Sequence, residues 1–306
     1  MSASGENLVY SSLEGLINQQ RYARLLNAPM RRRKAARQQG IHQVRYLGRG
    51  MEFSESRPYY PGDDIRNMDW KVTARTGEPH SKVFEEERER PVMLWCDLRP
   101  NMFFATRGQF KSVVMCEMAA LLAWRSWLAG DRVGGVVLSN GECFEQRPAR
   151  NKSSVLTFMK QLADESARPI GVTAPAHSLR RSWERLHRVL TPGSEVFMLS
   201  DFRGVSPGAE QQLQRIARQT TLRMIQITDP FEHTLPDDTR LRLSDGERFA
   251  WLDTRSKRTS NTYQQRDASR QHALERLAAG AHVGLLSVDT DTPVHQRLAK
   301  LRGGML

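Results

Sequence analysis

Four aspartates stand where predicted β-strands end, and carboxylates in such places can take part in acid–base chemistry. The apolar strand expected at 91–98 carries Asp97, and the strands expected at 195–199, 222–228 and 283–288 lead into Asp201, Asp229 and Asp289. In α/β proteins the carboxyl ends of parallel strands meet at one edge of the sheet, where ligands bind. The sequence therefore predicts a site at this edge.

A second acidic group lies upstream, in a turn-rich stretch. Its carboxylates are Asp63, Asp64 and Asp69, and each has a basic residue within a few positions. The basic residues are Arg57, Arg66, Lys71 and Arg75. Paired carboxylates could serve as a general acid and base, but interlocking salt bridges are the favoured interpretation because the arginine fork suits them.

Known catalytic motifs are missing from the chain. The sequence has no P-loop, no dinucleotide-binding glycine fingerprint, no Gly-x-Ser-x-Gly elbow and no His-Glu-x-x-His. The eight histidines are scattered, and the three cysteines lack metal-type spacing. These observations argue against a standard enzyme, and we expect none. Sparse cysteines and the lack of an apolar run or leader predict a cytoplasmic protein.

Strands alternate with helices over most of the chain. Besides the strands above, the pattern predicts strands at 132–138 and 142–147, a hairpin at 240–252, and helices that include 109–129, 152–163, 178–190, 208–218, 261–279 and 293–301. Such alternation is typical of an α/β fold with a mostly parallel sheet and helices on both faces. We expect a basic helical segment over 1–40, a small irregular extension with short strands near 44–47 and 83–87 over 41–90, and the α/β domain over 91–306. Within 65–70 a short helix is expected, capped by the Asp63-Asp64 turn.

Positive charge is concentrated at the two ends of the chain. Of a net charge of +12, residues 1–50 carry +7 (nine Lys/Arg, two Glu) and residues 255–306 carry +5 (nine Lys/Arg, four acids). A run at 31–37 holds five of these cations. Basic ends suit an anionic partner, which could be an acidic protein face, a lipid surface or nucleic acid.

The Asp97-Leu-Arg99-Pro-Asn101 loop, with Asp201 after the fourth strand, resembles the metal-adhesion site of von Willebrand A-type domains. The resemblance implies Asp97, Asn101 and Asp201 as ligands, with Mg²⁺ as the cofactor if a metal binds. Arg99 departs from the pattern because it carries donors only. Its guanidinium could itself supply the cation, paired with Asp97 or Asp201. Candidates for the third ligand position are Ser153, Ser154 and Thr157.

The stretch before this loop is similar to the hallmark of a bacterial family known as domain of unknown function 58. The match runs through Ser56-Arg57-Pro58-Tyr59-Tyr60-Pro61-Gly62-Asp63-Asp64-Ile65-Arg66-Asn67-Met68-Asp69-Trp70 and continues to Asp97. The resemblance implies a von Willebrand A-like fold and a MoxR-type AAA+ ATPase partner, with client proteins that mature or assemble. It supplies no enzymatic activity.

Two functions from different classes follow. The first is a non-enzymatic, chaperone-like adaptor that binds protein partners through Arg99, Tyr59, Arg66 and Trp70, since aromatic and arginine side chains anchor interfaces. Peripheral contact with membrane proteins is included in this reading, whereas a small-molecule substrate is not expected. The alternative is a basic protein that binds nucleic acid or an anionic surface, for which steep salt dependence would be diagnostic.

Overall fold

The computed structural model describes residues 8–26, 51–86, 89–168, 178–206, 208–236, 239–244 and 249–304. The chain divides into two compact units, a larger one from residues 1–31 and 90–306 and a smaller one from residues 32–89. The basic run at 31–37 and the strand expected at 44–47 lie outside the described residues. Among the described residues, no helix is both long enough and apolar enough to cross a membrane.

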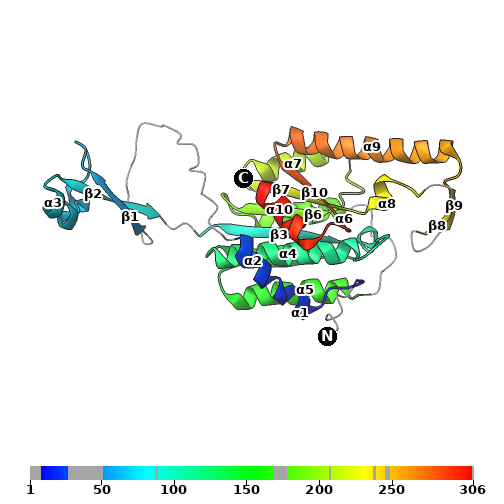
Figure 1. Cartoon of the computed structure of the whole chain (residues 1–306), viewed down its shortest axis with the longest axis horizontal. Coiled ribbons are helices and arrows are strands. Elements are labelled where there is room, and N and C mark those ends of the chain that lie inside the picture. The colour runs from blue at the N-terminus through cyan, green and yellow to red at the C-terminus, as the bar shows by residue number, and fades with distance from the viewer. Residues whose placement is uncertain are drawn as a thin grey trace. The chain divides into compact units, whose positions relative to one another are not determined.

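The larger unit is built on a six-stranded sheet (Figure 1). In sheet order the strands are β10 (Gly284–Asp289), β7 (Thr221–Thr228), β6 (Glu195–Ser200), β3 (Pro91–Leu98), β4 (Arg132–Ser139) and β5 (Glu142–Ala149). Neighbouring strands run parallel except β5, which pairs antiparallel with β4. All eight residues of β3 are buried, as expected for a central parallel strand covered on both faces.

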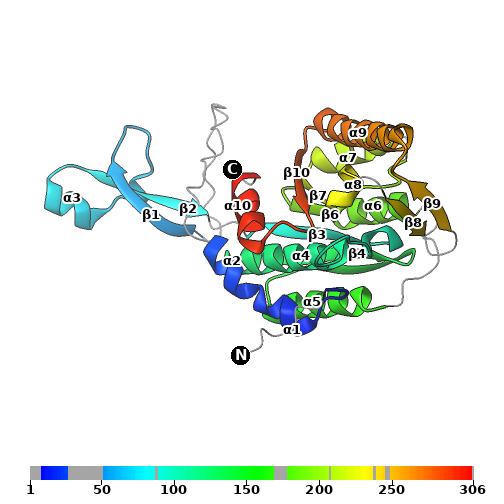
Figure 2. The ribbon, with the colours of Figure 1, turned by 45° about the vertical axis from the view of Figure 1, so that its right-hand side comes forward.

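Helices cover both faces of this sheet (Figures 1 and 2). One face packs against α1 (Leu13–Asn18), α2 (Gln20–Leu26), α4 (Lys111–Leu128), α5 (Lys152–Ser166) and α10 (Val294–Gly304). The other packs against α6 (Ser178–Val189), α7 (Ala209–Ala217) and α9 (Lys257–Gly280). The predicted class, an α/β fold with a mostly parallel sheet between helices, is confirmed.

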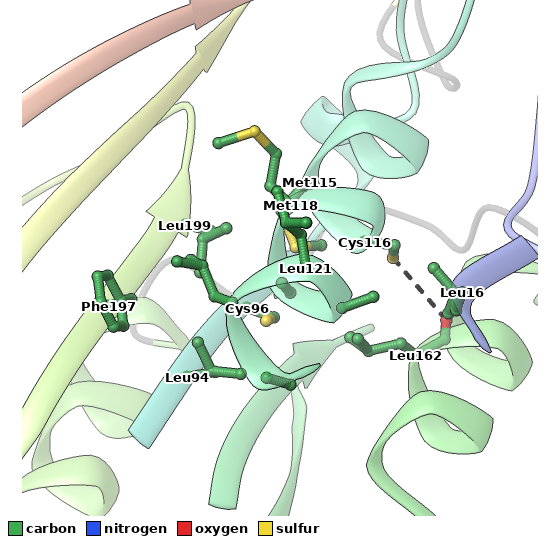
Figure 3. Packing of buried hydrophobic residues seen from close by; sticks show 14 of the residues in the cluster. Leu16, Leu94, Cys96, Met115, Cys116, Met118, Leu121, Leu162, Phe197 and Leu199 are labelled. Atoms are coloured by element: carbon green, nitrogen blue, oxygen red, sulfur yellow. Dashed lines mark hydrogen bonds between the residues drawn. The ribbon is translucent and has the colours of Figure 1, made fainter. Parts of the chain in front are cut away.

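Alternation along β3 divides the core into two layers. Leu94 and Cys96 face the α4 side, whereas Met93 and Trp95 face the α6 side. Figure 3 shows the first layer, in which side chains of β3 and β6 meet those of α4, α1 and α5. Gly135 of β4 is required here, because a Cβ at this position would lie 2.3 Å from the ring of Phe158.

The N-terminal helices α1 and α2 are part of this core. The indole nitrogen of Trp124 in α4 donates to the carbonyl of Leu16, 3.1 Å away, and the amide of Ser11 donates to Ser166 Oγ in α5. Leu16 and Leu26 are 1% and 2% exposed. Within the helical segment expected over 1–40, α1 and α2 are therefore buried against α4 and α5.

The smaller unit is a hairpin with two short helical pieces. Strands β1 (Met51–Pro58) and β2 (His80–Glu86) pair antiparallel, and between them lie the 3₁₀ turn η1 (Ile65–Asn67) and helix α3 (Trp70–Thr76). Two expectations were wrong in detail. Residues 51–58 form a strand in a stretch expected to be irregular. The short helix expected at 65–70 is instead the 3₁₀ turn η1 followed by a separate helix that begins at Trp70, where Asp69 is the N-cap and accepts from the amide of Val72.

Candidate functional site

The carboxyl edge of the parallel sheet gathers the predicted aspartates. Asp97 lies in β3, Asp201 follows β6, Asp229 follows β7 and Asp289 ends β10. The short helices η2 (Pro100–Met102) and α8 (Pro230–His233) follow β3 and β7 at this edge. We call the polar group formed by Asp97, Arg99, Asn101, Lys111, Asp201, Arg203 and Glu232 the edge cluster.

Arg99 and Asp97 form a bidentate pair. The guanidinium donates from Nε to Oδ1 at 2.9 Å and from Nη2 to Oδ2 at 2.6 Å. Asp97 is fully buried and Arg99 is 8% exposed. Ser200 Oγ donates to the same carboxylate at 2.6 Å. Burial alone would lower the pKa of Arg99, but the adjacent carboxylate of Asp97 raises it, so this cation stays charged.

Lys111, the first residue of α4, is the second internal cation. Its ammonium is 0% exposed and lies 2.8 Å from Asp201 Oδ2 and 2.7 Å from Glu232 Oε1. Asn101 donates to both oxygens of Asp201, at 2.7 and 2.8 Å. Burial would raise the pKa of Asp201, but Lys111, the amide of Arg203 and Asn101 together lower it.

Arg203 closes the cluster on its more exposed side. Its Nη2 lies 3.0 Å from Glu232 Oε1, and its Nε lies 3.7 Å from Asp201 Oδ2. Its carbonyl accepts from Arg99 Nη2 at 3.0 Å, which links the two ion-paired halves. Since its side chain is 35% exposed, Arg203 is the most exposed cation of the edge cluster.

Asp229, next to the edge cluster, is a carboxylate held by uncharged donors. It accepts from the amide and hydroxyl of Thr106 and from the hydroxyl of Thr290, and it caps α8 through the amide of Phe231. Burial would raise the pKa of Asp229, but these donors lower it. The four donors hold the carboxylate as a structural acceptor that joins the loops after β3, β7 and β10.

The edge cluster does not fit a divalent metal. The carboxylates of Asp97 and Asp201, which the resemblance implied as Mg²⁺ ligands, already bind Arg99 and Lys111, and Asn101 turns its amide nitrogen toward Asp201. Mg²⁺ needs free oxygen ligands in a near-octahedral arrangement. Among the described residues, no group of three or more His, Cys, Asp or Glu side chains could hold a metal. Arg99 and Lys111 instead occupy the carboxylates that a metal would need.

Several other expectations about the site can be placed in the structure. The pairing of Arg99 with Asp97 is present, whereas Lys111, Glu232 and Arg203 had not been predicted. The third-position candidates are not brought to the edge cluster: Ser153 and Thr157 bond within the start of α5, which follows the antiparallel strand β5 and so begins at the opposite edge. Arg99 uses its donors inside the protein, so its contact with a partner stays a prediction.

The acidic group of the smaller unit is tied into its turns. Arg57 pairs with Asp63 at 2.6 Å and lies over the ring of Tyr60, 5.4 Å from its centroid, while Asp63 accepts from the amide of Tyr60. Asp64 caps η1, and Asp69 caps α3 and accepts from Ser56, a bond that lowers its pKa. Of the expected salt bridges, Arg57–Asp63 is present. The other two carboxylates act as caps.

This turn presents large apolar side chains to solvent. Tyr60, Ile65 and Trp70 are 63%, 63% and 66% exposed. Of the predicted partner-binding residues, Arg66 and Trp70 are exposed and Tyr59 is half-buried, its amide donating to the carbonyl of Pro79. The ring of Tyr60 is thus held on a turn fixed by the Arg57–Asp63 pair, whereas Trp70 begins α3, whose N-terminus is capped by Asp69.

The sheet, its helices and the ion-paired edge define an α/β domain whose carboxyl edge is closed by internal salt bridges. The chain belongs to the family described as protein of unknown function DUF58, whose model matches residues 55–273. The expected family is therefore confirmed.

Relatives by sequence include uncharacterized proteins of Mycobacterium tuberculosis and Mycobacterium bovis. Each is 31% identical over 209 residues, which are 68% of this chain and 64% of the relative. The chain thus spans less than two thirds of the length of these relatives. Similar solved structures include the conserved hypothetical protein BatB from Bacteroides thetaiotaomicron (13% identity, TM-score 0.45, 71% of this chain and 97% of that chain). A von Willebrand factor type A structure from Catenulispora acidiphila shares 11% identity at a TM-score of 0.36 (74% and 43%).

Proposed function

We propose that this protein is a non-enzymatic, chaperone-like adaptor that binds a protein partner and works with a MoxR-type AAA+ ATPase in the maturation or assembly of other proteins. The observation that carries the proposal is the fixed, exposed aromatic turn of the smaller unit. Tyr60 and Trp70 leave about two thirds of their surface in water, an unfavourable exposure that binding would relieve. Because the Arg57–Asp63 pair holds Tyr60 and the Asp69 cap holds the start of α3 at Trp70, little conformational freedom is lost on binding.

The edge cluster also supports a non-enzymatic role. Asp97, Asp201 and Glu232 are each held by an internal cation, which leaves them poorly placed to act as base or nucleophile. Burial of such a network costs desolvation that good geometry must offset, and its best-attested use is to fix one conformation. We infer that the edge cluster fixes the loops after β3, β6 and β7 as a rigid surface.

Co-purification tests the adaptor role. The full chain would be mixed with the purified MoxR-type ATPase of its own host under nucleotide-trapping conditions. We expect a stable complex, and we expect the double variant Tyr60→Ala/Trp70→Ala to bind about 10-fold more weakly or worse, as for interface hot spots. Leu25→Ala, which removes an equally exposed apolar side chain from the larger unit, is the matched control.

Two results would overturn this proposal. One is the lack of any complex with the ATPase in every nucleotide state. The other is a complex that the aromatic double variant and the Leu25→Ala control form equally well. Arg203→Gln, which removes the charge of the most exposed cation of the edge cluster, separates the edge from the turn: unchanged binding by this variant would exclude the edge from the contact.

A further inference from the structure

The β8–β9 hairpin carries an exposed ladder of arginine and aromatic side chains. Strands β8 (Arg240–Ser244) and β9 (Phe249–Asp253) form a separate two-stranded sheet between α8 and α9, at one end of the larger unit (Figures 1 and 2). Arg240 lies over the indole of Trp251, 4.7 Å from its ring centroid, and Arg242 lies over the ring of Phe249 at 4.4 Å. We call these four residues the arginine–aromatic ladder.

Strand register places the whole ladder on one face of the ribbon. Arg242 lies opposite Trp251 on one face of the ribbon. Arg240 and Phe249 are each two positions from one of these residues along the same strand, so they lie on the same face. The stacked pairs Arg240–Trp251 and Arg242–Phe249 are therefore diagonal neighbours. Phe249 and Trp251 are 61% and 55% exposed. Two large rings in water on a ribbon of five-residue strands form an apolar surface without a partner among the described residues.

The base of the hairpin is fixed, so the ladder is held in place. The amide of Thr239 donates to Thr254 Oγ1 at 3.0 Å, and the amide of Thr254 donates to the carbonyl of Thr239 at 2.9 Å. Thr254 is buried. A ribbon pinned at its base and stacked along its face loses little conformational entropy when it binds.

The charge of this face is positive. Its carboxylate, Asp253, is bound by Arg255 through both oxygens, at 2.9 and 2.6 Å, and this bond, with the nearby charge of Arg240, lowers the pKa of Asp253 to about 2. Among the described residues, neither Arg240 nor Arg242 forms a salt bridge with a carboxylate, although Asp253 lies opposite Arg240 in the strand register. Residues 239–258, turn included, carry six Arg/Lys and three Asp/Glu, a net charge of +3.

We propose that the arginine–aromatic ladder docks an acidic segment of a partner protein. The free edges of the two guanidiniums can bind carboxylates in the bidentate geometry that arginine favours, and the rings beneath them supply apolar contact area. Tryptophan, phenylalanine and arginine are enriched in protein interfaces. The proposal rests on the proposed function in that the partner is a protein, and it adds the chemistry of the segment recognised.

Two other occupants fit the face less well. Single-stranded nucleic acid needs open ring faces on which bases stack, and here one face of each ring is covered by a guanidinium. A second copy of the chain would bring a net charge of +12 toward a positive face. Both remain outcomes of the test below.

Fluorescence anisotropy with the full chain tests the ladder directly. The probes are a fluorescein-labelled twelve-residue peptide of alternating Glu and Leu, the same peptide with Gln for Glu, and a labelled fifteen-nucleotide oligo-dT. We expect the Glu peptide to bind with a Kd below about 100 µM and the Gln peptide to bind at least about 10-fold more weakly. Tighter binding of oligo-dT than of the Glu peptide would overturn the proposal in favour of nucleic acid.

Variants separate the ladder from general positive charge. Arg240→Glu/Arg242→Glu should weaken peptide binding about 10-fold or more, whereas Arg147→Glu/Lys160→Glu, an equal charge change at exposed positions elsewhere, should weaken it less than about 3-fold. Arg240→Lys/Arg242→Lys keeps the charge but loses the planar fork, so an intermediate loss is expected. Equal losses in the Glu pair and its control would refute the ladder, as would no peptide binding by the wild type.

Failure of this inference can be told apart from failure of the adaptor role. If Arg240→Glu/Arg242→Glu loses the peptide yet still co-purifies with the ATPase, the ladder serves a different protein, such as a client. If the wild type forms the ATPase complex but does not bind the Glu peptide, the adaptor role is supported and the inference about the ladder is refuted. Sedimentation of the wild type at rising concentration checks the second-copy outcome, which would also count against the inference.

Discussion

The edge cluster and the turn of the smaller unit are made of the same kinds of residue and behave differently. In the turn, Arg57 and Asp63 are six positions apart, and the arginine side chain is 29% exposed. In the edge cluster, Lys111 reaches Asp201 and Glu232 across 90 and 121 positions, and its side chain is 0% exposed. Burial and sequence separation, rather than residue type, set the role of each group.

The difference shows what each arrangement can contribute. An exposed ion pair is weak because water screens it, so the Arg57–Asp63 pair can order a turn but adds little to stability. A buried cation between two carboxylates cannot be removed without leaving uncompensated charge. The edge cluster therefore stabilises the fold, whereas the turn holds exposed side chains in position.

Replacing Lys111 by Met should have the largest effect. The variant keeps most of the side-chain volume but leaves Asp201 and Glu232 without their buried cation, so we expect the free energy of unfolding to fall by about 3–5 kcal/mol. Urea denaturation followed by tryptophan fluorescence measures it. Lys160→Met, at an exposed position of α5, should change stability by less than about 0.5 kcal/mol. If the free energy of unfolding fell no more for Lys111→Met than for this control, the stabilising role of the edge cluster would be contradicted.

Acid should weaken the carboxyl edge of the sheet. The pKa values of Asp201 and Asp229 are lowered in the folded protein, so their contribution is present above the unfolded value of about 3.9 and is lost as pH falls through the folded values. Each proton taken up contributes at most about 1.4 kcal/mol per pH unit. When urea unfolding is measured from pH 7 to pH 3, the urea concentration at the midpoint should decrease once the pH is below about 4.

The Lys111→Met variant should show a different pH profile. Without the ammonium, burial raises the pKa of Asp201, so protonation between pH 7 and pH 4 relieves part of the penalty. The stability gap between wild type and variant should therefore narrow on acidification. Parallel profiles of the two proteins over this range would show that Lys111 does not hold the charge of Asp201.

Much of the fold could be predicted because its signals are local. The buried run of β3, the apolar length of α4 and the aspartates that end β3, β6 and β7 follow from short stretches of sequence. The N-caps at Asp64 and Asp69 are likewise set by neighbours, although the second was missed and the helix was placed too early. Strand β1 was missed because it leads into a turn-rich stretch and pairs with a strand more than twenty positions away.

The edge cluster was only half predictable. Arg99 could be paired with Asp97 because the two are adjacent in one loop, whereas Lys111 and Glu232 meet only after the sheet forms. A signal for Lys111 did exist in the sequence. It is a lysine at the start of a helix that is apolar all around, where the helix dipole disfavours a cation, so a buried carboxylate partner was needed. The several carboxylates expected at the carboxyl edge of the sheet were candidates for that partner.

Breaking the Arg57–Asp63 pair should cost little stability. For Arg57→Met we expect a loss of about 0.2–1 kcal/mol, because the pair is partly exposed. The larger consequence should be mobility of the turn, because Arg57 also covers the ring of Tyr60. Faster hydrogen exchange of residues 59–64, with unchanged exchange in the larger unit, is the readout. A stability loss as large as that of Lys111→Met would erase the contrast between the two regions.

The smallest effect should be that of added Mg²⁺ on the wild type. Because Arg99 and Lys111 already bind the carboxylates, the melting temperature should not change between excess EDTA and millimolar MgCl₂, whereas a ligand that bound the folded state would raise it. The double variant Arg99→Ser/Lys111→Ser frees Asp97 and Asp201 and should melt at a lower temperature in EDTA than the wild type. If the internal cations stand in for a metal, Mg²⁺ or Mn²⁺ should restore part of that loss. If the metal raised the melting temperature of the wild type but not that of the variant, Arg99 and Lys111 would not be substitutes for a metal.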